Sequence, residues 1–161
     1  MTTRALTLLV ILTLAATTCA SGAARDVESL KGVTAFKVEL EYKPSPGTAS
    51  YLELTAGHLQ ATVEARLRDG GLPVLELGDP YLRIHILSGG NDHGLIMYGV
   101  ELDFMQEGPS ADDTAFLETW QLHSAGIVDN REMQGQVQKD LEDGLDEFIH
   151  DWFSVNPTAS E

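Results

Sequence analysis

Three separate segments of the chain alternate apolar with charged or polar side chains at every second position. From Phe36 to Tyr42 the even-numbered residues are apolar and the residues between them are charged. Tyr81–Leu87 and Leu95–Gln106 are built in the same way. A period of two is typical of a β-strand with one buried and one exposed face. We therefore predict half-buried strands at Val33–Tyr42, Tyr81–Leu87 and Leu95–Gln106.

Two further segments carry a weaker strand signal. Leu72–Leu77 is short, and in Ala115–His123 the pattern leaves open which face is buried. Polar, glycine-rich segments lie between the later strands, at Ser88–Gly94 and Glu107–Asp113. Such segments are typical of turns, so the second half of the chain is predicted to fold as consecutive hairpins.

Two segments show the helical period instead. Ser50 and Glu53 have the spacing of a capping box, and the apolar residues that follow predict a helix from about Tyr51 to Arg68. Asp129 is predicted to cap a final helix. The apolar stripes of the two predicted helices are Leu52, Ala56, Leu59, Val63 and Leu67, and Met133, Val137, Leu141, Leu145, Phe148 and Trp152.

The order of these elements predicts the fold class. Each of the three clearly alternating strands has only one apolar face. One side of the sheet is therefore expected to carry the helices and the other to face water. We predict an α+β, two-layer sandwich with a mostly antiparallel sheet of four to five strands and two helices on one face. Residues 25–156 are expected to form this single domain, and residues 157–161 a polar tail.

Residues 1–24 have the layout of a secretory signal peptide. Arg4 supplies a basic start, Ala5–Ala16 an apolar run and Thr17–Ala24 a run of small residues. The apolar run is shorter than the ~20 residues of a membrane-spanning helix. Cleavage is expected after Ala20 or Ala24. The mature protein is then expected in the periplasm or outside the cell, without a transmembrane segment.

Cys19, the only cysteine, raises a lipoprotein as the alternative. The residues before it, Ala16-Thr17-Thr18, match a lipidation signal poorly, so a lipid anchor at Cys19 is the less favoured prediction. Ordinary cleavage leaves a mature chain with no cysteine and no disulfide. A domain of this length can bury a sufficient core without one.

The charge of the chain restricts its partners. Twenty-five acidic against ten basic residues give a formal net charge of −15. Nucleic acids and anionic lipid surfaces require cationic patches, and the sequence has no cluster of Lys and Arg. Neither partner is expected.

One combination of residues predicts a metal site. If the hairpins close at Gly89–Asp92 and at Pro109–Ser110, then His85, Met97 and His123 form one row across three strands of the open face. Thioether and imidazole ligands suit copper(I), and imidazole also suits zinc. A copper or zinc site at His85, Met97 and His123, with His93 as a possible addition, is therefore the alternative function.

Other candidate chemistry is weaker. Glu147 and His150 have the E-x-x-H spacing of carboxylate-bridged metal sites, but His150 is predicted on the outer, acidic side of its helix. The serines lack the G-x-S-x-G context of a nucleophile elbow, so we lean away from an enzyme. Phe153 and Val155, near the end of the last helix, are instead expected to contribute to an apolar partner-binding patch.

The C-terminal third resembles small exported bacterial proteins of unassigned function. In these, a Thr-Trp-Gln-like strand precedes a terminal helix of the form Leu-Asp-x-Phe-x-x-Asp that closes near an Asn. The matching residues here are Thr119, Trp120, Gln121, Leu145, Asp146, Phe148, Asp151 and Asn156. The order of elements is also similar to that of the lipoprotein plug of the lipopolysaccharide-assembly machinery. These resemblances imply an exported α+β protein and bring no activity with them. The expected function is a non-enzymatic binding module of the periplasm or envelope, which binds an unknown protein or small ligand through the open sheet face or the patch at the end of the last helix.

Overall fold

The computed structural model describes residues 25–44, 56–90, 94–109 and 114–157 of the chain. These residues form one short 3₁₀ helix, two α-helices and five strands. In chain order they are η1 (Val27–Leu30), β1 (Phe36–Pro44), α1 (Ala56–Asp69), β2 (Val74–Leu75), β3 (Tyr81–Gly90), β4 (Leu95–Pro109), β5 (Thr114–Asp129) and α2 (Met133–Val155). Each predicted strand is present, although β5 continues six residues beyond the predicted end at His123.

The five strands form a single sheet in the order β2-β1-β3-β4-β5. The predicted hairpins β3–β4 and β4–β5 are antiparallel, as expected. The sheet as a whole is mixed, however, because β1 pairs in parallel with both β2 and β3. The reason lies in the connection: α1 carries the chain over the sheet before it returns, and such a crossover joins parallel strands.

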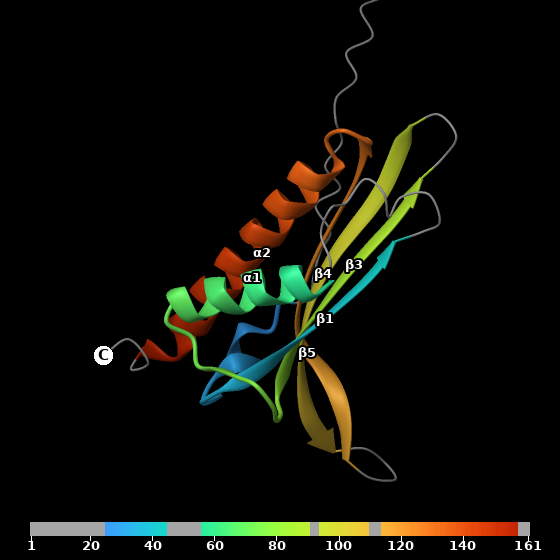
Figure 1. Ribbon diagram of the computed structural model, residues 1–161. Coiled ribbons are helices and arrows are strands. Elements are labelled where there is room, and N and C mark those ends of the chain that lie inside the picture. Colours follow the sequence, from blue (N-terminus) through green and yellow to red (C-terminus); the bar gives the residue numbers. More distant parts are fainter. Residues whose placement is uncertain (1–24, 45–55, 91–93, 110–113, 158–161) are drawn as a thin grey trace, which may run out of the picture.

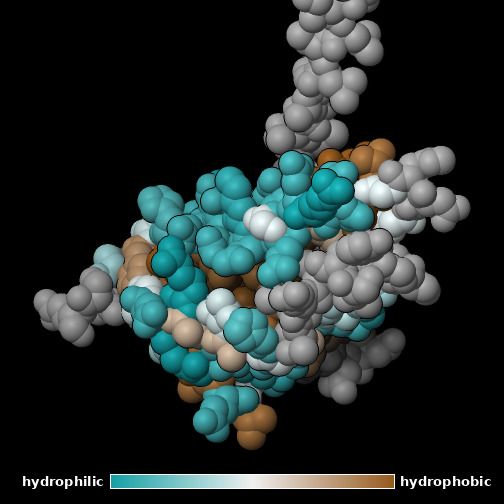
Figure 2. All heavy atoms as spheres, turned by 45° about the horizontal axis from the view of Figure 1, so that its top comes forward, coloured by the Kyte–Doolittle hydropathy of each residue, from teal (hydrophilic) through white to brown (hydrophobic). Residues whose placement is uncertain are grey.

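The predicted α+β two-layer architecture is confirmed. Both α-helices lie on the same face of the sheet, and α2 runs across β4 and β5 (Figure 1). We call this side the covered face and the opposite side the open face. The face of the molecule seen in Figure 2 is mostly hydrophilic, with hydrophobic side chains in several separate places.

The core lies between the sheet and the two helices. All six residues of the predicted α2 stripe are buried, and so are Leu59, Val63 and Leu67 of α1. At the centre of the core, Phe148 contacts Phe36, Trp120 and other rings at centroid distances of 5.0–6.1 Å. Aromatic rings at such distances stabilise a core beyond the area that they bury.

Two buried or half-buried carboxylates attach α2 to the sheet. Asp151 accepts a 2.9 Å hydrogen bond from the Trp120 indole N–H. Asp140 accepts hydrogen bonds from the Tyr98 hydroxyl at 2.8 Å, from Ser124 and from Gln136 at 2.8 Å. These bonds also settle the orientation of β5, which the sequence left open. Trp120 and Ser124 point toward the helices, so His123 points to the open face.

The ends of the helices differ in part from the prediction. Asp129 does not cap α2; its carboxylate accepts a hydrogen bond from the Arg131 N–H in a turn, and α2 begins at Met133. The proposed capping box of α1, Ser50 and Glu53, lies outside the described residues.

Candidate binding face

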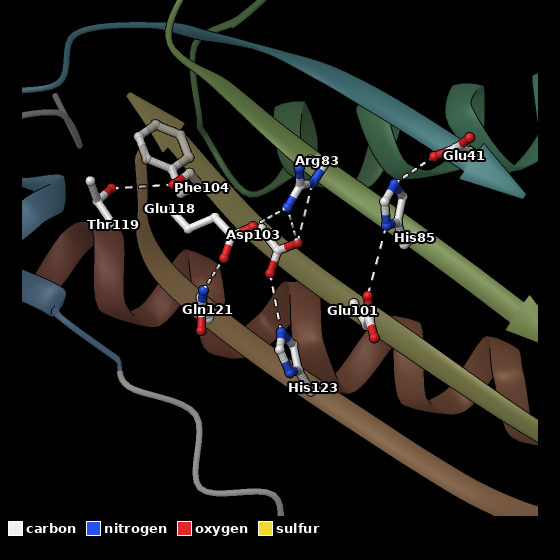
Figure 3. Close-up of polar contacts among 10 residues, drawn as sticks. All are labelled: Glu41, Arg83, His85, Glu101, Asp103, Phe104, Glu118, Thr119, Gln121 and His123. Carbon is white, nitrogen blue, oxygen red and sulfur yellow. Dashed lines mark hydrogen bonds and ion pairs between the residues drawn. The ribbon is translucent and has the colours of Figure 1, made fainter. Parts of the chain in front are cut away.

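The open face carries two rows of polar side chains that cross four strands. The register of the sheet sets their members, because directly paired residues point to the same face. The first polar row contains Glu39, Arg83, Asp103 and Gln121, and the second contains Glu41, His85, Glu101 and His123. Figure 3 shows the side chains of both rows except Glu39 in front of the sheet, with the helices behind.

The register predicted for the metal row is wrong. His85 lies opposite Glu101, and Met97 pairs instead with Gly89 and Ile127. The cause is the position of the two turns: β3 continues to Gly90 and β4 to Pro109, so each hairpin closes about two residues later than predicted. When a turn shifts by two residues, the partner of each residue across the hairpin changes by four positions. This even number keeps every side chain on its predicted face.

Asp103 is the most buried charged residue of the open face, with 3% of its surface exposed. One carboxylate oxygen accepts hydrogen bonds from Arg83 at 2.9 and 3.3 Å, and the other lies 3.1 Å from His123 Nε2. A buried carboxylate is stable only when its oxygens are hydrogen-bonded. Asp103 therefore holds an arginine and a histidine in fixed positions on a surface that is otherwise solvated.

The electrostatics of Arg83 follow from this arrangement. Burial acts to lower the pKa of the Arg83 guanidinium, but hydrogen bonds from Arg83 to Asp103 and Glu118 act the other way, and the pKa is raised overall. Glu118 in turn accepts a hydrogen bond from Gln121. Asp103, Arg83, Glu118 and Gln121 thus form a connected network in which Arg83 pairs with two carboxylates.

In the second polar row, His85 lies between two glutamates. Its Nε2 atom is 2.6 Å from Glu41 and its Nδ1 atom 3.7 Å from Glu101. The pKa of Glu41 is lowered, first by a hydrogen bond from Lys43 and further by the neighbouring His85. His123 completes the row on the far side of Glu101. The row alternates carboxylates with imidazoles, so each imidazole has a carboxylate as its neighbour.

The open face also contains a histidine–carboxylate pair. His123 and Asp103 resemble the base and orienting carboxylate of a nucleophilic site, but the two polar rows contain no Ser, Thr or Cys. No group of three or more His, Cys, Asp or Glu side chains in the described part of the chain is placed to hold a metal ion. Copper or zinc binding at His85, Met97 and His123 stays a prediction.

A shallow pocket of about 360 Å³ adjoins the polar rows beside β1. Glu39, Glu41, Arg83 and His85 line it, and Gln60 of α1 contributes at its margin. Val38 and Leu40 also line the pocket, so four of its seven lining residues are ionisable.

The open face has an apolar end that the sequence reading missed. Its residues are Leu87, Leu95, Met97 and Ile127, which we call the apolar patch. Met97 and Ile127 pair directly across β4 and β5 and are 62% and 66% exposed. The sequence of β4 contains a sign of this patch. Leu95 and Met97 lie on the same face of the strand as Glu101 and Asp103, but they are apolar. β5 was predicted to end before Ile127, so its partner was not recognised.

The other predicted sites lie away from this face. Phe153 and Val155 are half-buried and pack against the core, and Phe153 is within 3.5 Å of the position of a Cβ on Gly71. Glu147 and His150 are exposed on α2, as predicted, and Glu147 forms an ion pair with Arg25. His93 is outside the described residues. Neither described helix combines the length and the apolar character of a membrane span.

Comparison with protein-family models, with curated proteins and with solved structures finds no match to this chain.

Proposed function

We propose that this protein is an exported, non-enzymatic binding module that engages a protein partner through the open face of its sheet. The observation that carries the proposal is the apolar patch beside the two polar rows. Exposed apolar side chains that are contiguous and bordered by polar groups are typical of interaction sites. The core lies on the covered face, so the patch has no role in burying it.

The polar rows support the same conclusion. Their side chains are held by hydrogen bonds and ion pairs before any partner arrives, which reduces the entropy lost on binding. Fixed charges next to an apolar area contribute orientation and specificity, while the apolar area supplies most of the affinity. The absence of a nucleophile from the two polar rows favours binding over catalysis.

Site-specific photocrosslinking in the native host tests the binding proposal. A photoreactive amino acid at position 127 is expected to crosslink one protein specifically. The same group at position 77 is the control, because Leu77 is 84% exposed but lies outside the apolar patch. Equal crosslinking from both positions, or none from position 127, would contradict the proposal.

The export proposal rests on residues 1–24 and needs its own test. The intact mass of the protein purified from the envelope fraction is expected to match a chain beginning at Ser21 or Arg25. A mass that retains Met1–Ala24 would contradict export by cleavage. A diacylglycerol addition on Cys19 would instead show the lipoprotein alternative.

Metal binding is the second candidate, and one observation favours it: His85 and His123 flank Glu101 in the same row. Titration of the metal-free protein with Zn²⁺ and Cu⁺, followed by calorimetry, tests it. This function requires one metal per chain and a clear loss of affinity in both His85→Ala and His123→Ala. Unchanged affinity in the two variants would place any bound metal elsewhere.

A further inference from the structure

The two edges of the sheet are built differently. On one side, β2 pairs with β1 at Phe36 and Lys37, and Gln60 of α1 donates a 3.4 Å hydrogen bond to the Val38 carbonyl. β1 also alternates charges along its length, which is a common protection against pairing with other chains. On the other side, β5 is the last strand, and no described strand pairs with its outer edge.

The outer edge of β5 is also uncharged. Thr119–Val128 contains no Asp, Glu, Lys or Arg, in a chain in which 22% of residues are charged. η1 lies against only the first part of this segment, where Ser29 donates a 3.1 Å hydrogen bond to the Thr119 carbonyl. We call Gln121–Val128 the open edge. Long, uncharged edges of this kind accept an additional strand.

The covered side of the open edge is incompletely buried. On β4, every even-numbered residue from Ile96 to Phe104 is buried under the helices. On β5, the residues of the same layer, Leu122, Ser124, Gly126 and Val128, are only half-buried. A further strand beside β5 would cover Leu122 and Val128 and would satisfy the outward backbone groups of the open edge.

The side of α2 above the open edge is acidic. Asp140 and Glu147 lie on the same side of the helix as Asp151, which contacts β5. The three donors to the Asp140 carboxylate, Tyr98, Ser124 and Gln136, are all neutral, so its charge is not paired by them. Glu147 pairs with Arg25, whose positive charge is also 3.9 Å from Asp151. More negative than positive charge remains along this side.

We propose that the open edge takes an extended basic segment of a partner protein as a sixth strand of the sheet. The backbone of the segment pairs with β5, and its Lys or Arg side chains at alternate positions meet Asp140 and Glu147. A second copy of this chain fits less well, because its own β5 segment has no cations and both molecules carry a net charge of −15. This inference rests on the proposed function and names the class of partner.

Three synthetic peptides of about eight residues, the length of a typical strand, serve as probes. The first alternates Lys with Val, the second replaces Lys by Glu, and the third is the Lys peptide with alternate backbone amides N-methylated. The mature full-length chain is titrated with each peptide by fluorescence anisotropy, and amide hydrogen exchange is followed in parallel. The N-methylated peptide keeps all charges but cannot pair as a strand, so it separates strand addition from simple ionic attraction.

The Lys peptide is expected to bind at least about tenfold more tightly than either control, a difference that charge complementarity and strand pairing commonly produce. It should slow exchange at alternate amides of Gln121–Val128 and not in β1. Glu147→Gln should weaken the Lys peptide by about threefold, the range of one exposed ion pair. The matched variant Glu142→Gln, on the side of α2 away from β5, should leave its affinity unchanged.

Equal affinity for the Lys peptide and its N-methylated form would overturn the proposal, and so would the absence of protection in β5. Protection of β5 that rises with protein concentration alone, with a dimeric mass in sedimentation, would assign the open edge to a second copy. If any of these results is obtained and position 127 still crosslinks one protein specifically, the binding function stands and only the strand-addition site is rejected.

Discussion

Asp151 on the covered face and Asp103 on the open face are both almost fully buried carboxylates, 6% and 3% exposed, but they have different neighbours. Asp151 accepts its hydrogen bond from Trp120, a fully buried indole of the core. Asp103 binds Arg83 and His123, whose side chains remain 26% and 37% exposed. The covered face thus uses a carboxylate to close the core, whereas the open face uses one to fix charged groups at the surface.

The two faces therefore use their buried carboxylates differently. Changes in the core of the covered face should alter the free energy of unfolding, because its side chains are buried. Changes on the open face should alter stability little, because water can replace the lost contacts. If the open face is the binding surface, its variants will separate binding from folding.

The largest effect is expected for Phe148→Ala. The ring lies against four other aromatic rings at the centre of the core, and truncation leaves a cavity, so the free energy of unfolding should fall by about 3–5 kcal/mol. Urea unfolding measures it. The control Leu77→Ala, at an exposed site, should stay within about 0.5 kcal/mol of the original protein. Similar losses in the two variants would refute the assignment of the core.

Asp151→Ala should have the next largest effect. It leaves the buried Trp120 N–H without its acceptor, which costs about 1–3 kcal/mol of unfolding free energy. A double-mutant cycle with Trp120→Phe separates this bond from general packing. Additive losses in the double variant would mean that the hydrogen bond does not attach α2 to the sheet.

Asp103→Ala should cost less, about 1 kcal/mol, because Arg83 keeps its ion pair with Glu118 and His123 can turn to water. The unfolding free energy of Asp103→Ala and Asp151→Ala, measured side by side, tests the comparison. A larger loss of unfolding free energy for Asp103→Ala than for Asp151→Ala would contradict the comparison. It would mean that the open-face network stabilises the fold.

The smallest effect on stability is expected for the double substitution Met97→Thr with Ile127→Thr. Both side chains are more than half exposed, and threonine is as favourable in strands as the residues that it replaces. The free energy of unfolding should stay within about 0.5 kcal/mol. A loss of several kcal/mol would show that the apolar patch belongs to the core.

The sequence predicted the layers of the fold because periodicity survives small errors in position. The α2 stripe from Met133 to Trp152 and the alternation of β3 and β4 correctly gave the buried faces. The parallel pairing of β1 was not predicted, because residue alternation does not encode which strands are neighbours. It follows from the path of the chain through α1.

The candidate site could be predicted only in part, for a related reason. The face of His85 was correct, since it depends on a period of two, whereas the pattern of β5 left the face of His123 open. The residue that lies between the two histidines is Glu101 and not Met97. The identity of this neighbour depends on where each turn closes. Predicting the apolar patch required the register of β4 with β5. Met97 and Ile127 are thirty positions apart and meet only when β4 pairs with the full length of β5.

The most direct test of the open face as the binding surface is the affinity of the crosslinked partner, once purified, for two forms of the protein. The original chain is compared with the Met97→Thr/Ile127→Thr variant, and Leu77→Thr is the control. We expect the double variant to bind at least about tenfold more weakly, which corresponds to the burial of one large apolar side chain, while its unfolding free energy is unchanged. Equal affinity in the two forms would contradict the central claim.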